Sequence, residues 1–171
     1  RNRLQRIDVV NRLLAIPLYS GFAVEQLYHV ADLARLVRYP AGQIIFRQGE
    51  HPDGFYVIDT GQVVERVIGA VPGTQTWPKY LTAGSFFGRY SLLNRTKRRA
   101  TAQAVTDVSL FRFNADAFDW LRELQPEFEK ALTRHDLLGA LRGIPIFSRL
   151  DEEELKHLAG YVGLAFIPPE E

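Results

Sequence analysis

The sequence of 171 residues contains no cysteine, which excludes disulfide bonds, thiol nucleophiles and cysteine-ligated metal sites. It also contains no methionine, not even at position 1, so we expect the chain to be a fragment of a longer protein. No apolar run reaches the roughly 18 residues that a membrane-spanning helix requires. These absences are compatible with an intracellular protein, and we expect a cytoplasmic location and no membrane span in this fragment.

An excess of charge is lacking as well. The 21 Lys and Arg residues against 20 Asp and Glu residues give a net charge of +1, which provides no general attraction to nucleic acids. The hydrophobic fraction of 46% and the charged fraction of 24% are typical of a soluble globular protein. The length allows one full domain with a core of its own and some residues beyond it. We therefore expect a globular domain without a nucleic-acid partner.

Positive charge is instead concentrated in residues 84–101. Gly88 lets the backbone approach a ligand closely, and residues 89–93 can form one helical turn whose first N–H groups face an anion. Arg98 lies just before a small-residue strand, residues 100–105, that would hold its guanidinium rigidly against a phosphate. The segment therefore predicts a phosphate site. The alternative is a solvated basic loop, because Arg95, Lys97, Arg98 and Arg99 all lie in one stretch.

The same residues carry a family resemblance. Phe87-Gly88-x-x-Ser91-Leu92 followed by Arg98-x-Ala100-Thr101 resembles the phosphate-binding cassette of cyclic nucleotide-binding domains, as in catabolite activators and the regulatory subunits of cAMP-dependent kinases. The pattern in that family is Phe-Gly-Glu-x-Ala-Leu, a short loop, and then Arg-x-Ala-Thr or Arg-x-Ala-Ser. Residues 42–46, 53–58, 61–63 and 107–113 resemble the family's other strands and turns, in the family's order.

The resemblance implies a role for several residues. Arg98 would pair with the exocyclic oxygens of a cyclic phosphate, the N–H groups of Tyr90 and Ser91 would cradle it, and Thr101 would lie near the base. Arg99 competes with Arg98 for this role, since some members of the family have a loop one residue longer. The ligand-binding set implied by the resemblance is Phe87, Gly88, Arg89, Tyr90, Ser91, Leu92, Arg98, Arg99, Ala100 and Thr101. The expected ligand is cyclic AMP, cyclic GMP or another phosphate compound, with no cofactor and no catalysis.

One residue departs from the family pattern. Arg89 stands where the family carries the Glu that accepts a hydrogen bond from the ribose 2′-hydroxyl, and a guanidinium has no acceptor. The loss of such a bond costs about 1.5–3 kcal/mol. Three outcomes remain open: a cyclic nucleotide bound differently, another phosphate ligand, or a barrel that no longer binds a ligand and serves as an interaction or dimerisation module.

The periodicity of the chain predicts a mainly β fold with flanking helices. Apolar residues at helical spacing indicate a helix in residues 4–14, and a second helical stretch runs from Val24 until Tyr39-Pro40 closes it. Short β-rich runs separated by glycine follow, which favours an antiparallel β-barrel, of the jelly-roll type that the resemblance implies. The predicted strands are 44–46, 55–58, 63–67, 80–81, 100–105 and 110–113.

The end of the chain repeats its beginning. Ile144-Pro145 and the residues that follow align without gaps on Ile16-Pro17, and Asp151-x-x-Glu154 predicts a capping box at the repeated helix. Before this repeat, Asn114 is expected to cap a helix, and Pro126 to begin another. We therefore predict an N-terminal helix (1–15), a cyclic nucleotide-binding-like domain (16–142) and the start of a second copy (143–171). The second copy is an expected partner of the first, and a homodimer is a further expectation.

Other candidate sites are weaker. His29, His51, His135 and His157 show no metal-ligand spacing, so a metal site is not expected. Glu50, Asp53 and Asp59 each stand beside Gly or Pro, or next to a residue that does, and are interpreted as turn residues. Trp77 is expected to fold back from a hairpin tip onto the barrel. A transcription factor of the catabolite-activator type is disfavoured, because no helix-turn-helix pattern occurs in these residues.

Overall fold

The structure is a computed structural model that describes residues 3–67, 69, 78–124, 141, 145–147 and 149–161. The chain divides into two compact units, Arg1–Leu124 and Gln125–Glu171, and each is described by itself. Within the described residues no helix is both long and apolar enough to cross a membrane.

The first unit contains two four-stranded sheets in which every strand pair is antiparallel. One sheet has the order β1 (Arg35–Tyr39), β8 (Val108–Phe113), β3 (Phe55–Thr60) and β6 (Phe86–Phe87). The other has the order β2 (Ile44–Phe46), β7 (Thr101–Ala104), β4 (Gln62–Arg66) and β5 (Lys79–Thr82). Most neighbouring strands are far apart in sequence, as in jelly-roll folds, and the predicted fold class is confirmed.

The two sheets share one apolar core. Each strand alternates its side chains between two faces, so one face of each sheet is available to pack against the other. The buried core residues come from both sheets, namely Phe46, Tyr56, Ile58, Val63, Leu81, Phe87, Ala102, Ala104, Val108 and Leu110. The core therefore fixes the two sheets face to face and leaves the loops at their ends for a binding site.

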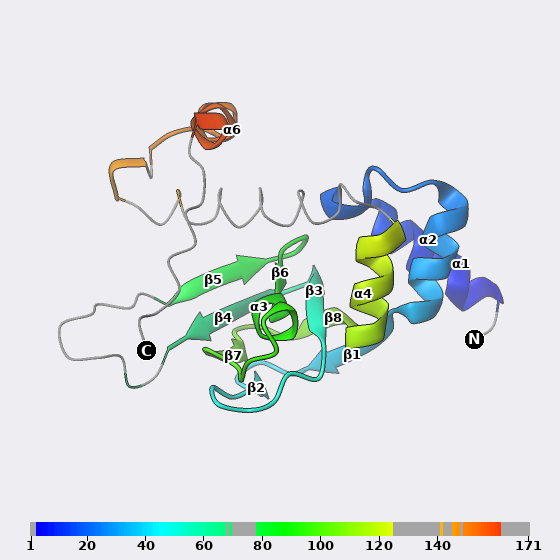
Figure 1. Cartoon of the computed structure of the whole chain (residues 1–171), viewed down its shortest axis with the longest axis horizontal. Coiled ribbons are helices and arrows are strands. Elements are labelled where there is room, and N and C mark those ends of the chain that lie inside the picture. Colours follow the sequence, from blue (N-terminus) through cyan, green and yellow to red (C-terminus); the bar gives the residue numbers. More distant parts are fainter. Residues whose placement is uncertain are drawn as a thin grey trace. The chain divides into compact units, whose positions relative to one another are not determined.

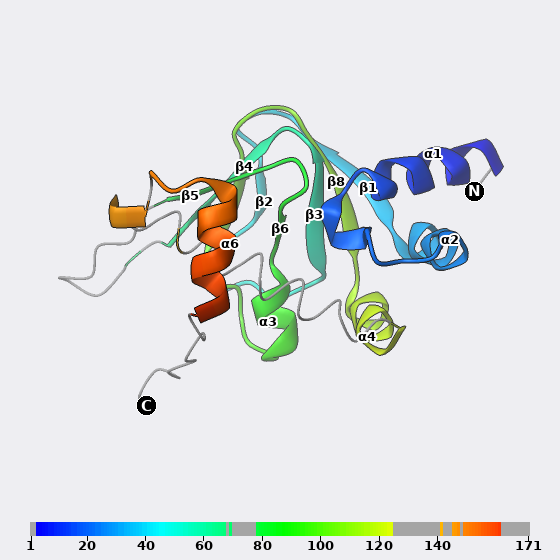
Figure 2. The same ribbon diagram turned by 90° about the horizontal axis from the view of Figure 1, so that it is seen from above.

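Helices cover the other face of the β1–β8–β3–β6 sheet. Figures 1 and 2 show α1 (Arg3–Leu14), α2 (Val24–Leu33) and α4 (Ala115–Leu124) gathered on that side of the molecule. Aromatic rings make the contact: Phe55 stacks on Phe113 with 5.0 Å between the ring centroids and meets Phe118 of α4 edge-on, also at 5.0 Å. The predicted cap of α4 is confirmed, because Asn114 Oδ1 accepts the Ala117 N–H at 2.9 Å.

The predicted strands are confirmed within one or two residues at each end, with two corrections. The helical stretch predicted to continue to Tyr39 ends at Leu33, and Arg35–Tyr39 form β1, which pairs with β8 along its whole length. The sequence also did not indicate β6, a strand of two residues. Both errors concern strands whose conformation depends on a distant partner rather than on local periodicity.

The second unit repeats local structure of the first. The 3-10 helix η2 (Pro145–Phe147) and the helix α6 (Glu152–Tyr161) correspond to η1 (Pro17–Tyr19) and α2 at residue numbers that differ by 128 throughout. The predicted capping box is confirmed: Asp151 Oδ1 accepts the Glu154 N–H at 2.8 Å, and Glu154 Oε2 accepts the Asp151 N–H at 2.9 Å. The predictions for Trp77, Pro126 and His135 lie outside the described residues.

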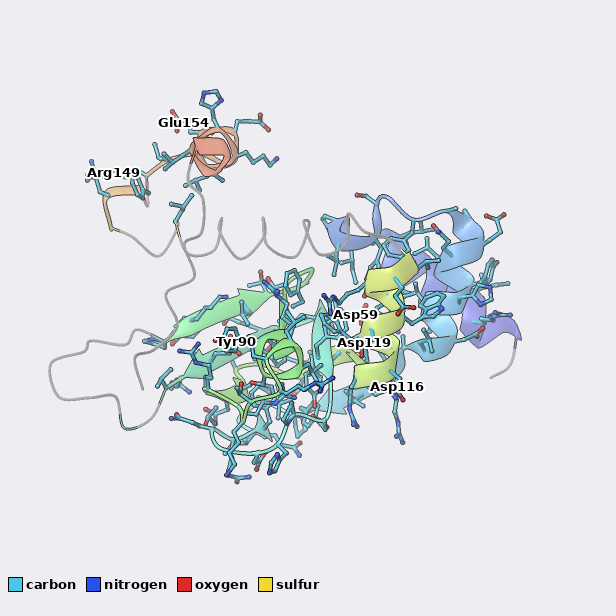
Figure 3. The ribbon with its side chains drawn as sticks, viewed as in Figure 1. Asp59, Tyr90, Asp116, Asp119, Arg149 and Glu154 are labelled. Carbon is cyan, nitrogen blue, oxygen red and sulfur yellow. The ribbon has the colours of Figure 1, made fainter. Side chains whose placement is uncertain are left out.

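An ion pair fastens α1 to the barrel. Between Ile58 and Thr60 the register of β3 against β8 shifts by one residue, so Asp59 is the extra residue of a β-bulge. Its carboxylate accepts two hydrogen bonds from Arg12 of α1, and the hydrogen bond with Asp59 is the main cause that raises the pKa of Arg12. Asp59, labelled in Figure 3, is therefore a strand residue, and its interpretation as a turn residue is wrong.

We predict that Arg12→Gln destabilises the first unit by about 2–3 kcal/mol, because it leaves the Asp59 carboxylate without its charged partner when the side chain is only 7% exposed. Arg6→Gln is the matched control, since Arg6 pairs with Asp32 at a more exposed position on the same helix and its loss should cost about 0–1 kcal/mol. Urea denaturation measures both, and equal losses would contradict a special role for the bulge.

Candidate functional site

The residues that the sequence predicted to bind a ligand lie in and beside the loop between β6 and β7. Gly88 follows β6 with a φ of +81° and begins the short helix α3, which spans Arg89–Leu93 as expected. Only glycine adopts this left-handed conformation without strain. Figure 3 labels Tyr90, which lies on α3.

Gly88 is also required by a close contact. A Cβ atom at this position would lie 2.7 Å from Nη1 of Arg98, and the Gly88 carbonyl accepts a hydrogen bond from that same nitrogen at 2.5 Å. The turn and the arginine are therefore fitted to each other. This contact explains why the residue before α3 is glycine. Any residue with a Cβ atom would collide with Arg98, even one that accepts a positive φ.

Arg98 is buried, with only 2% of its surface exposed. Its backbone is fixed by two hydrogen bonds, from the Gly49 N–H to the Arg98 carbonyl and from the Arg98 N–H to the Glu50 carbonyl, both 2.8 Å. Its Nη2 donates to Asp53 Oδ1 at 3.0 Å and to the Gly54 carbonyl at 2.7 Å. Its Nε is buried and has no hydrogen-bond partner among the described residues.

Aromatic rings form the floor beneath this guanidinium. The Arg98 Cζ lies 4.0 Å from the centroid of the Phe46 ring and 5.9 Å from that of Tyr56. Tyr56 in turn stacks on Phe87 at 5.2 Å. A cation over an aromatic face in a site that excludes water gains about 2 kcal/mol, which partly offsets the cost of burying its charge.

Asp53 links the arginine to a second one. Its Oδ1 pairs with Arg98 and its Oδ2 with Arg112, with both N–O distances 3.0 Å, and the Tyr56 hydroxyl donates to Oδ1 at 3.1 Å. Burial, and then the nearby Asp53 charge, raise the pKa of Tyr56. The interpretation of Asp53 as only a turn residue is therefore incomplete. The sequence signal that was missed is its position just before the strand that faces the cassette.

The other predicted residues lie around this centre. Ser91 is buried and its hydroxyl donates to the Lys97 carbonyl at 3.2 Å, which closes the loop. Thr101 Oγ1 accepts the Gln48 N–H at 3.0 Å, so this hydroxyl already has a partner in the barrel. The Arg99 guanidinium lies over the Tyr90 ring at 4.6 Å, at the surface. Leu92 and Ala100 are half-buried.

Arg89 lies in the first turn of α3. It is half-buried, and its guanidinium is 5.9 Å from the centroid of the Phe86 ring. The structure thus brings all the predicted residues into one loop region, with Arg98 inside and Arg99 outside. Arg98 is therefore the buried arginine of the pair and Arg99 the exposed one.

This arrangement suits an anion rather than a metal. A guanidinium carries donors and no acceptor, and here it is held rigidly beside a helical turn. No group of His, Cys, Asp or Glu side chains within the described residues could hold a metal ion.

Comparison with known proteins agrees with this chemistry. Residues 36–124, about half of the chain, match the family model described as "Cyclic nucleotide-binding domain". The chain belongs to the cyclic nucleotide-binding domain family. The matched residues include all of β1 except Arg35, the other seven strands, the cassette and α4, so the family assignment covers the whole candidate site.

Relatives of this cyclic nucleotide-binding domain include a kinase regulatory subunit and a protein kinase. The chain is 34% identical over 119 residues to the cAMP-dependent protein kinase regulatory subunit of Schizosaccharomyces pombe, and 35% identical over 118 residues to the cGMP-dependent protein kinase, isozyme 1, of Drosophila melanogaster. These matches cover 68% and 67% of this chain but only 27% and 15% of the relatives. The regulatory domain of Toxoplasma gondii PKA with cAMP has a TM-score of 0.66 at 25% identity, covering 78% of this chain and 50% of that one.

We predict that Gly88→Ala destabilises the domain more than Gly42→Ala does. Both glycines have a positive φ, +81° and +82°, and both replacements incur about 1–2 kcal/mol of backbone strain. Only at position 88 does the new Cβ collide with Arg98, at 2.7 Å, which adds about 1–3 kcal/mol. Thermal melting of the two variants tests this, and an equal loss would show that the Gly88–Arg98 contact is easily relaxed.

Proposed function

We propose that this domain is a regulatory module that binds a cyclic nucleotide at the cassette, with Arg98 as the ligand of the cyclic phosphate. The observation that carries the proposal is the buried guanidinium with an unpartnered Nε, placed directly behind the turn of Gly88 and α3. A phosphate would supply the missing acceptor in a charge-assisted bond. The kinase relatives and the cAMP-bound neighbour support cyclic AMP or cyclic GMP as the ligand.

Binding requires the cassette to open. Arg98 is almost inaccessible, and Asp53 and the carbonyls of Gly54 and Gly88 already accept from it. A phosphate has to displace at least the Gly88 carbonyl, which moves α3. Ile58 is bonded to the loop that enters the cassette, through Ile58 N–H to the Ser85 carbonyl and Gly84 N–H to the Ile58 carbonyl, both 2.8 Å. We infer that this movement passes along β3 to the helices.

The alternative function is a barrel that binds no nucleotide and serves as an interaction or dimerisation module. The internal partners of Arg98 favour this alternative, because both Nη atoms already donate to acceptors within the domain. The unpartnered Nε favours binding instead. Calorimetric titration with cyclic AMP, cyclic GMP and cyclic dinucleotides distinguishes the two functions. Micromolar or tighter binding of any of them supports the regulatory module, and no measurable binding of all of them supports the non-binding barrel.

We also propose that the second unit is the start of a second domain of the same family. The matching positions of η1 with η2 and of α2 with α6 support this, as does the capping box at Asp151. The domain boundaries, a homodimer and a cytoplasmic location stay predictions.

We predict that Arg98→Ala lowers the affinity for a cyclic nucleotide by about 30-fold or more, because it removes a charge-assisted contact that contributes about 2 kcal/mol. Arg95→Ala and Lys97→Ala are the matched controls, since both side chains are exposed on the same loop. Calorimetry measures the affinities, and Arg98→Lys, which keeps the charge, guards against misfolding. Equal losses for Ala at all three positions would indicate a diffuse basic patch and would refute the assignment.

We predict that Arg89→Glu raises the affinity for cyclic AMP or cyclic GMP about tenfold or more, because a carboxylate restores the acceptor for the ribose 2′-hydroxyl. Lys97→Glu is the control, since it reverses a charge on the same loop at an exposed position. A weaker affinity for Arg89→Glu would mean that Arg89 serves a different anion. If no phosphate ligand responded in a folded variant, the non-binding alternative would be favoured.

A further inference from the structure

A second cluster of positive charge lies beside the cassette, on the face of the β1–β8–β3–β6 sheet that meets the other sheet. Arg35 of β1 stands directly opposite Arg112 of β8, and Arg112 stands opposite Tyr56 of β3. Residues directly opposite in an antiparallel pair point to the same face. Tyr56 belongs to the core between the sheets, so Arg35 and Arg112 extend its row to the edge of the sheet.

This row has more positive charge than its acids neutralise. Asp53 is shared, with Oδ1 on Arg98 and Oδ2 on Arg112. The Arg35 side chain is exposed and forms no hydrogen bond or ion pair with any residue that the structure describes. The Asp53 carboxylate is therefore the one negative charge described here for three guanidiniums, those of Arg35, Arg98 and Arg112.

Like charges directly opposite on neighbouring strands are destabilising, by a few tenths of a kcal/mol to about 1 kcal/mol. An oxyanion between two guanidiniums removes this repulsion and receives two charge-assisted forks of donors. The place is reachable without opening the cassette. The Arg112 side chain is 30% exposed, whereas that of Arg98 is 1% exposed.

We propose that Arg35 and Arg112 form a second anion site, separate from the cassette, for a small free oxyanion of the phosphate class. The anion competes with Asp53 for Arg112. When Arg112 binds the anion, the Asp53 carboxylate pairs with Arg98 alone and holds it more firmly. A cyclic nucleotide then competes less well for Arg98, so an occupied second site weakens nucleotide binding at the cassette. The site itself does not depend on the proposed function, but this antagonism does.

The test is a titration of the whole chain with inorganic phosphate at constant ionic strength, followed by the NMR signals of the arginine Nε–H groups. We expect the Arg35 and Arg112 signals to move together and to saturate with a dissociation constant on the order of 1–10 mM. Arg35→Gln should weaken this binding about tenfold. Arg38→Gln is the matched control, because Arg38 is an exposed arginine of the same strand, opposite Ser109, on the other face of the sheet. It should change the affinity less than twofold.

Three results would overturn the second site. These are equal weakening by Arg35→Gln and Arg38→Gln, no saturation by about 50 mM phosphate, or an Arg98 signal that moves while that of Arg112 does not. The antagonism is measured separately, as the affinity for cyclic AMP with and without phosphate. We expect a two- to fivefold loss in the wild type and none in Arg35→Gln. Unchanged affinity in the wild type overturns the antagonism alone, whereas absence of any cyclic AMP binding counts against the proposed function.

Discussion

The burial of the Arg98 guanidinium is the constraint on which the end of the barrel depends. An isolated buried charge is too costly to survive in a folded protein, so every group around it has to be a compensating one. Asp53 supplies the opposite charge, and the carbonyls of Gly54 and Gly88 accept hydrogen bonds from the guanidinium. The Phe46 ring face lies 4.0 Å from the guanidinium carbon. Glycine at position 88 follows from the same demand, because a Cβ there would occupy the space of Nη1.

Strand β3 connects this centre to the helices. The strand begins at Phe55, directly after Asp53 and Gly54, and both of these residues contact Arg98. Its middle is hydrogen-bonded to Gly84 and Ser85 at the entrance of the cassette, and the next residue, Asp59, holds Arg12 of α1. A rearrangement at the cassette is thus one strand away from the N-terminal helix. This short path gives the proposed relay a physical basis without requiring a contact between ligand and helix.

Local sequence predicted most of the fold, and its failures have a common cause. Glycines, Asn114 and Asp151 mark turns and caps through interactions with neighbouring residues, and these predictions are confirmed. The sequence assigns Arg35–Tyr39 to a helical stretch because Tyr39-Pro40 is the break signal that ends it. The pairing of this segment with β8, which lies 69 to 77 residues further along the sequence, decides the outcome. Asp59 was misread for the same reason, since the bulge that aims it at Arg12 exists only in the paired sheet.

The sequence by itself determined the family, the cassette and the identity of the residues that could meet a phosphate, because motif spacing and turn chemistry are local properties. Only the tertiary structure decided that Arg98 is the buried arginine and Arg99 the exposed one, that Asp53 bridges Arg98 and Arg112, and that Arg35 stands opposite Arg112. These facts depend on burial and on strand register. Both are set by contacts between segments distant in sequence, and no local pattern records them.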